Sequence, residues 1–139
     1  MQLAFVCVGN AGRSQFASAL AERAITDRDL DIDVRRGGTD PADHIHEEVR
    51  ITLLEDGIDI GDREPRPITD EELADSTIVV TMGCSIADRL PDDWAGHHES
   101  WSLDHPKGDD LDTYRQQRDD IRDHVEDLLN RIERGEISG

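Results

Sequence analysis

The sequence predicts a protein of the α/β class in three layers, with a four-stranded parallel sheet covered by helices on both faces. Two observations carry this prediction. Short apolar runs alternate along the chain with longer segments of helical periodicity, the order in which strand–helix–strand units occur. Polar loops follow three of the apolar runs, and in a parallel sheet such loops meet where the strands end. We expect residues 1–139 to form a single domain, because this length allows one buried core.

The first half of the chain supplies two strands and two helices. Leu3–Val8 is a continuous apolar run, typical of a buried parallel strand. Arg13–Thr26 is predicted to be a helix because its apolar residues recur near helical spacing. Asp31–Arg36 alternates as a second strand and ends at two glycines. Pro41–Glu55 is predicted to be a second helix. The apolar residues that indicate it, one turn apart, are Ile45, Val49 and Leu53.

The second half supplies the remaining elements. Thr69 is the predicted N-cap of a short helix. Thr77–Met82 is a continuous apolar strand and Glu99–Leu103 a fourth strand, with a helical turn over Ser85–Leu90 between them. Leu111–Arg134 is predicted to be a long helix because its apolar residues fall on one stripe.

The composition is acidic and poor in lysine. Asp and Glu total 33 against 15 Lys and Arg, the formal net charge is −18, and the single lysine is Lys107. Such a surface argues against nucleic-acid binding. It is typical of a protein from a high-salt cytoplasm, where a Debye length of about 3 Å at 1 M salt screens the self-repulsion.

Neither export nor membrane insertion is indicated. Met1-Gln2 leads directly into the first strand, so we expect no signal peptide. No apolar run approaches the roughly 20 residues of a membrane span. The two cysteines, Cys7 and Cys84, indicate cytosolic thiol chemistry rather than a disulfide framework. We therefore expect a cytoplasmic protein.

The loop after the first strand, Cys7–Ser14 (CVGNAGRS), is the most informative segment. An oxyanion needs donors that converge from one side, and successive amides of a tight loop provide them together with the start of the next helix. Arg13 adds a planar, always charged guanidinium that can bind two oxygens. Cys7 would lie beneath the anion as a thiolate nucleophile, stabilised by the same amides and by the Ser14 hydroxyl. The residues predicted to bind the oxyanion are Val8, Gly9, Asn10, Ala11, Gly12, Arg13 and Ser14.

Four segments resemble one known family. Cys7–Gln15 (CVGNAGRSQ) resembles the phosphate-binding loop of low-molecular-weight protein tyrosine phosphatases and of the related thioredoxin-coupled arsenate reductases. Val79–Cys84 resembles the reductase segment that carries a second redox cysteine. Trp101–Gly108 resembles the Asp-x-Pro-x-Gly loop of the reductases, and Tyr114–Ile121 the start of their C-terminal helix. The resemblance covers nearly the whole chain and implies the low-molecular-weight phosphatase-like fold.

The resemblance also implies roles for two residues outside the loop. Asp104 would be the general acid that protonates the leaving oxygen. Cys84 would attack the arsenylated Cys7, which releases arsenite and forms a disulfide. A thioredoxin-like protein or a small-molecule thiol would then reduce this disulfide, and no bound cofactor is implied. A relay of three cysteines is excluded, because Ser85–Asp92 contains no cysteine and Gly12 stands where related loops often carry one.

The remaining polar residues receive simpler interpretations. Asn10 is expected to hold the loop through side-chain hydrogen bonds. Ser18 stands where some reductases carry an acidic residue near a potassium ion, so we predict no metal site. Four of the six histidines are interpreted as solvated. These are His44 and His46 on the second helix and His97 and His98 in a loop.

Three functions stay open. The first choice is a reductase in which Cys7 attacks arsenate, Arg13 and the loop hold it, Asp104 protonates the leaving oxygen and Cys84 resolves the adduct. The alternative is a low-molecular-weight (tyrosine) phosphatase that hydrolyses phosphomonoesters through a phosphocysteine, with Cys84 protecting Cys7 by reversible oxidation. His105-Pro-Lys-Gly, which stands where these phosphatases carry substrate-gripping tyrosines, argues against phosphotyrosine. The third is a non-catalytic oxyanion- or phosphoprotein-binding module, which would need neither a thiolate nor a general acid.

Overall fold

A computed structural model describes residues 1–103 and 110–137. Its four strands run parallel in the order β2-β1-β3-β4, which confirms the predicted sheet. In chain order the elements are β1 (Gln2–Cys7), α1 (Arg13–Asp27), β2 (Asp33–Gly38), α2 (Glu47–Glu55), α3 (Asp70–Asp75), β3 (Ile78–Met82), a 3-10 turn (Ala87–Arg89), β4 (His97–Ser100) and α4 (Leu111–Glu133).

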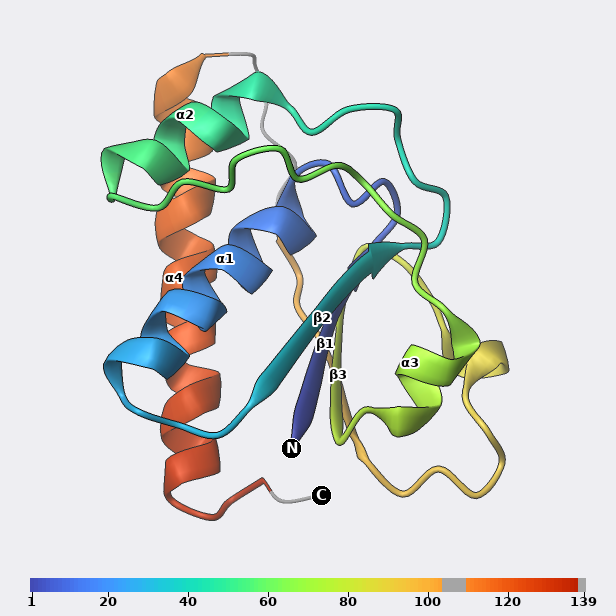
Figure 1. The fold of residues 1–139 in the computed structure, drawn as a ribbon. Coiled ribbons are helices and arrows are strands. Elements are labelled where there is room, and N and C mark those ends of the chain that lie inside the picture. The colour runs from blue at the N-terminus through green and yellow to red at the C-terminus, as the bar shows by residue number, and fades with distance from the viewer. Residues whose placement is uncertain (104–109, 138–139) are drawn as a thin grey trace.

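Helices cover both faces of the sheet. Figure 1 shows α1, α2 and α4 on one side and α3 on the other. Alternating residues of β1 enter the two cores that result, as a buried parallel strand requires. Leu3, Phe5 and Cys7 belong to the larger core beneath α1 and α4, whereas Ala4 and Val6 belong to the smaller core beneath α3. Cys7 therefore ends its strand with the side chain on the side of α1.

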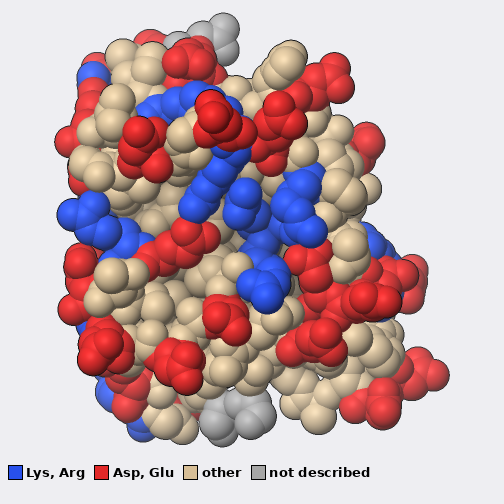
Figure 2. Space-filling view, in the orientation of Figure 1, with Lys and Arg blue, Asp and Glu red and all other residues tan. Residues whose placement is uncertain are grey.

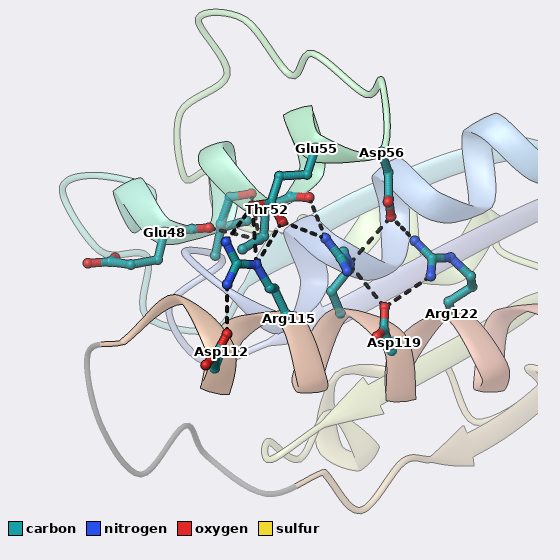
Figure 3. Close-up of polar contacts among 10 residues, drawn as sticks. Glu48, Thr52, Glu55, Asp56, Asp112, Arg115, Asp119 and Arg122 are labelled. Carbon is teal, nitrogen blue, oxygen red and sulfur yellow. Dashed lines mark hydrogen bonds and ion pairs between the residues drawn. The ribbon is translucent and has the colours of Figure 1, made fainter.

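Ion pairs join α2 to α4 (Figure 3). Arg118 is buried, with a side chain only 11% exposed, and it donates to the Thr52 carbonyl (2.8 Å) and to Glu55 (3.1 Å). Arg115 binds the same Glu55 carboxylate at 2.7 Å. Because a buried guanidinium is stable only when its donors are used, these contacts fix α2 against the first half of α4.

Two predicted bounds are wrong. The second helix begins at Glu47 rather than Pro41, because backbone amides between 39 and 46 donate to carbonyls of the Cys7 loop and so are not free for helical bonds. The fourth strand covers His97–Ser100 rather than Glu99–Leu103. It is an edge strand whose residues alternate in exposure. Such a strand can be polar throughout, so no apolar run in the sequence indicated it. The other bounds agree within two residues, and Thr69 caps α3 through a capping box with Glu72.

Candidate active site

The loop between β1 and α1 turns its carbonyl oxygens away from its own centre. Each carbonyl from Cys7 to Gly12 accepts a hydrogen bond from elsewhere in the chain. The pairs are Thr39 N–H to Cys7 O (3.0 Å), Asp40 N–H to Val8 O (2.9 Å), Ala42 N–H to Gly9 O (2.9 Å), Gln15 Nε2 to Asn10 O (3.0 Å), His46 N–H to Ala11 O (3.0 Å) and Phe16 N–H to Gly12 O (3.0 Å).

The loop amides are left for a ligand. Within residues 1–103 and 110–137, the N–H groups of Gly9, Ala11 and Gly12 donate to no other group. The first amides of α1 likewise have no intrahelical acceptor. Carbonyls held outward and amides left free make a cradle for an anion, with the positive end of the α1 dipole at its rim.

Cys7 lies at the base of this cradle in a hydrogen-bonded network. Its thiol is 3% exposed and accepts from the Asn10 amide at 3.2 Å, and Ser14 Oγ lies 2.9 Å from the sulfur. Asn10 Nδ2 donates to the same Ser14 oxygen at 2.6 Å. Because that oxygen already accepts a hydrogen bond, the Ser14 hydroxyl proton can point to Cys7. A thiolate in this place receives two donors.

Asn10 is held in turn by residues on two other segments. Its side-chain oxygen accepts from Gln15 Nε2 and from the Arg66 amide, both at 3.0 Å. The backbone of Asn10 is left-handed, with φ of 51°, a conformation that asparagine tolerates better than most residues. The expected holding role of Asn10 is thus visible as geometry. Gln15 and Arg66, which support it, were not predicted, because their part depends on contacts that only the fold creates.

Arg13 begins α1 and lies against the end of β3. A side chain at Gly83 would place its Cβ 2.6 Å from Arg13 Nη1, and Gly83 itself has φ of +76°. The positive φ therefore favours glycine there, and any side chain at this position would displace the guanidinium. Within the part of the chain that the structure describes, Arg13 forms no ion pair with a carboxylate. Its charge is available to a bound anion.

Cys84 follows Gly83 on the same edge of the sheet. Met82 and Cys7 are paired across β3 and β1, so the two loops leave the sheet side by side. Arg13, Gly83 and Cys84 line one open pocket, together with Ser100. Burial raises the pKa of the Cys84 thiol, and a negative charge on Cys7 raises it further. Burial and the charge of Cys7 thus favour Cys84 as the neutral thiol.

A pocket of about 210 Å³ opens at Cys7, and residues far away in the sequence form its second wall. They are Ala42, His46, Tyr114 and Gln117. His46 Nδ1 lies 3.4 Å from the Tyr114 hydroxyl. His46 is exposed, as predicted, but it lies just before α2 rather than within it. The sequence does not indicate that His46 lies at the pocket, because its position depends on the hydrogen bond from the His46 amide to the Ala11 carbonyl.

Two other histidines, His97 and His98, lie in a strand, β4, rather than in the expected loop. His97 Nε2 lies 2.8 Å from Glu99, and His98 Nε2 lies 3.1 Å from Thr81 Oγ1. His97 is therefore half-buried rather than solvated, whereas His98 and His44 are exposed as expected.

Two further expectations concern the general acid, Asp104, and a metal site near Ser18. Asp104 lies outside the described residues. Ser18 is buried, and its hydroxyl donates to the Gln15 carbonyl at 3.3 Å. In residues 1–103 and 110–137, no three His, Cys, Asp or Glu side chains gather as metal ligands. No helix in these ranges is long and apolar enough to span a membrane.

The fold and the cradle define a class of thiol-containing, oxyanion-binding α/β domains, and sequence comparison narrows that class to one family. The model of the family described as low molecular weight phosphotyrosine protein phosphatase matches residues 2–137. The chain belongs to this family.

Its relatives include several named as arsenate reductases. A putative arsenate reductase of Halobacterium salinarum is 44% identical over 91% of this chain and 89% of its own length. A glutaredoxin arsenate reductase of Synechocystis is 30% identical over 92% of this chain and 95% of its own. Among solved structures, a thioredoxin-dependent arsenate reductase of Corynebacterium glutamicum has a TM-score of 0.80 at 34% identity, and the alignment covers 96% of this chain but only 62% of that one.

Proposed function

We propose that this chain is a thiol-dependent arsenate reductase. The observation that carries the proposal is the placement of Cys7 in an anion cradle with a second cysteine, Cys84, in the neighbouring loop beside Arg13. Similarity to relatives named as arsenate reductases supports it, the first at 44% identity.

In the first step, the Cys7 thiolate attacks arsenic. A sulfur–arsenic bond forms and one arsenate oxygen leaves as water once it is protonated. We assign the proton to Asp104 on the family resemblance alone. The free amides of the loop and Arg13 hold the other oxygens, whose negative charge they offset while the bond forms.

In the second step, Cys84 attacks the Cys7 sulfur. A disulfide forms, the sulfur–arsenic bond breaks, and its electron pair stays on arsenic, so As(V) becomes As(III) and leaves as arsenite. Cys84 gives up its proton as it attacks. Because burial raises its pKa, this step needs the thiol to reach the solvent or a base as the loop moves. A thiol reductant, thioredoxin-like or small, then restores both cysteines by donating two electrons.

The phosphatase alternative uses the same first half. The family description supports it. In that case water hydrolyses a phosphocysteine, and Cys84 only protects Cys7 by reversible oxidation. A non-catalytic module is the weakest of the three, since the network that directs Asn10 and Ser14 to the Cys7 sulfur contributes nothing to simple anion binding.

The test compares wild type with Cys7→Ser and Cys84→Ser. We measure arsenite production with a thiol donor and, separately, hydrolysis of an aryl phosphate. We expect wild type to reduce arsenate, Cys7→Ser to lose both activities, and Cys84→Ser to lose reduction with the protein reductant. Phosphate ester turnover that survives in Cys84→Ser without any arsenate reduction by wild type would favour the phosphatase. Unchanged activities in Cys7→Ser would overturn both enzyme functions.

We further propose that the enzyme works in a high-salt cytoplasm. The net charge of −18 supports this, as does the similarity to a relative from Halobacterium salinarum.

A further inference from the structure

One group of arginines carries more positive charge than its neighbours balance. Figure 2 shows a band of basic side chains across the middle of the molecule, in the region that β2 crosses in Figure 1, with acidic side chains around it. Arg36 belongs to β2, and Arg63 and Arg66 come from the segment between α2 and α3. None of the three lines the pocket at Cys7.

Two carboxylates, those of Glu22 and Glu72, form hydrogen bonds with guanidinium groups of this cluster. Arg66 binds Glu72 through two nitrogens at 2.9 and 3.0 Å, and its Nη1 also donates to the Arg36 carbonyl at 2.6 Å. Arg63 Nη2 donates to Glu22 at 2.6 Å. Within residues 1–103 and 110–137, the Arg36 side chain has no hydrogen bond or ion pair. Its Nε is buried without a partner, and so is Nη1 of Arg63.

This arrangement is unusual for a chain in which acidic residues outnumber basic ones by 33 to 15. Most of the other arginines have carboxylate partners, such as Arg28 with Glu133 at 2.8 Å and Arg131 with Glu99 at 2.9 Å. Burial lowers the pKa of Arg36, and the positive charges of Arg63 and Arg66 lower it further, although Glu22 and Glu72 raise it in part. A half-buried cation beside like charge is costly unless an anion joins it.

We propose that Arg36 and Arg63, with Arg66 beside them, form a second anion site for a small inorganic oxyanion such as phosphate or arsenate. Guanidinium N–H groups match the spacing of oxyanion oxygens and bind them through paired, charge-assisted hydrogen bonds. The Nη1 and Nη2 atoms of Arg36 have no hydrogen-bond partner among the described residues either and, unlike its Nε, they are not buried, so they are the donors that an anion would reach first. The anion would balance the positive charge of the three arginines that Glu22 and Glu72 do not compensate.

The site is connected to the nucleophile through the backbone of Arg66. The Arg66 amide donates to Asn10 Oδ1, and Asn10 Nδ2 donates to Ser14 beside Cys7. An anion that holds the Arg66 guanidinium also holds the segment that supports Asn10. Occupation of the second site should therefore stabilise the catalytic loop without entering it.

The experiment counts bound sulfate, an oxyanion that a thiolate does not reduce. Equilibrium dialysis with radiolabelled sulfate is run on wild type, Arg36→Gln, Arg13→Gln and the double variant. Potassium fluoride sets the ionic strength, because its strongly hydrated anion competes weakly for guanidinium. Arg28→Gln is the matched control, since it removes an arginine whose charge Glu133 already balances. We expect two sulfates per wild-type or control chain, one in each single variant and none in the double variant.

Several outcomes would overturn the second site. They are a single sulfate on wild type, two sulfates on Arg36→Gln, or a second sulfate that equimolar chloride displaces completely, which would indicate a halide site. If Arg36→Gln does not fold, Arg36→Met replaces it, and the sulfate-dependent rise in Tm provides a second readout. That rise should be smaller in the Arg36 variant than in Arg28→Gln. Because the count does not depend on turnover, it can fail while the reductase proposal stands, and the reverse is also true.

Discussion

At the scale of single residues, the chemistry depends on which way the hydrogen bonds around Cys7 run. Ser14 Oγ accepts from Asn10 Nδ2 at 2.6 Å and lies 2.9 Å from the Cys7 sulfur, so its one proton is left for the sulfur. The sequence pattern suggested the Ser14 contact. It could not suggest that Arg66, 56 residues from Asn10 in the chain, helps to fix the direction of that proton.

Ser14→Ala should slow attack by Cys7. A hydrogen bond to a charged group contributes about 1.5–3 kcal/mol, which corresponds to a loss of roughly 10- to 100-fold in kcat/KM. We expect the same variant to slow the alkylation of Cys7 by iodoacetamide, measured in the Cys84→Ser background. Ser18→Ala is the matched control, because Ser18 is a buried serine of the same helix whose hydroxyl donates to the Gln15 carbonyl. Equal alkylation rates in the two variants would show that Ser14 does not stabilise the thiolate.

Gly83→Ala should damage the binding of the oxyanion as well as the stability of the fold. The added methyl group would lie 2.6 Å from Arg13 Nη1 and force the guanidinium to move, so KM for arsenate should rise. The left-handed backbone at φ of +76° adds a destabilisation of about 1 kcal/mol. Gly61→Ala separates the two effects, since Gly61 has φ of +57° but a Cβ added there would meet no atom within 4 Å. A Gly61→Ala variant with the same change in KM would contradict the steric explanation.

At the scale of elements, the sequence predicted well those helices that are determined by their own pattern of apolar residues. The helices α1 and α4 agree with prediction within one residue, because each carries its own apolar stripe. The predicted start of α2 was wrong because the amides of Asp40, Ala42 and His46 donate hydrogen bonds to carbonyls of a loop more than 30 residues earlier in the chain. The second wall of the pocket was missed for the same reason: it exists only once α2 and α4 are packed together.

The last strand and the last helix are joined by a buried carboxylate, Glu99. Its side chain is 17% exposed and binds Arg131 through two nitrogens at 2.9 and 3.0 Å. Trp101 Nε1 donates to it at 2.7 Å. Burial alone would raise the pKa of Glu99, but the hydrogen bonds from Arg131, Trp101 and His97 outweigh it and lower the pKa to about 2. The charged form therefore holds β4 to α4.

Glu99→Gln should destabilise the protein in a pH-dependent way. Because the folded pKa of about 2 lies below the ordinary value of 4.5, the contribution of Glu99 is complete above 4.5 and lost as the pH falls toward 2. At about 1.4 kcal/mol per pKa unit, it amounts to at most about 3.5 kcal/mol at neutral pH. Urea unfolding of wild type and Glu99→Gln at several pH values measures this difference, with Glu71→Gln, an exposed glutamate, as the control. A difference that does not shrink between pH 4.5 and 2 would contradict the linkage.

At the scale of the whole molecule, attraction within ion-pair networks competes with general repulsion. The network between α2 and α4 in Figure 3 pairs Arg115, Arg118 and Arg122 with carboxylates on both helices. Salt weakens the more exposed of these pairs, such as that of Arg115 with Glu55. An exposed pair contributes about 0–1 kcal/mol. Even with every basic residue paired, the chain keeps an excess of 18 negative charges, whose mutual repulsion salt also weakens. The two effects of salt have opposite signs, and the excess of like charge should decide which prevails.

We therefore expect the Tm of this protein to rise with potassium chloride. At 0.01 M salt the Debye length is about 30 Å, comparable to the size of the domain, so all the excess carboxylates repel one another, whereas at 1 M it is about 3 Å. Most of the gain should come below about 0.5 M, because screening changes most steeply there, and thermal unfolding followed by circular dichroism measures it. Sucrose at matched water activity is the control, since it favours compact states without screening charge. An equal rise in sucrose, or full structure and activity without added salt, would show that charge repulsion does not limit this fold.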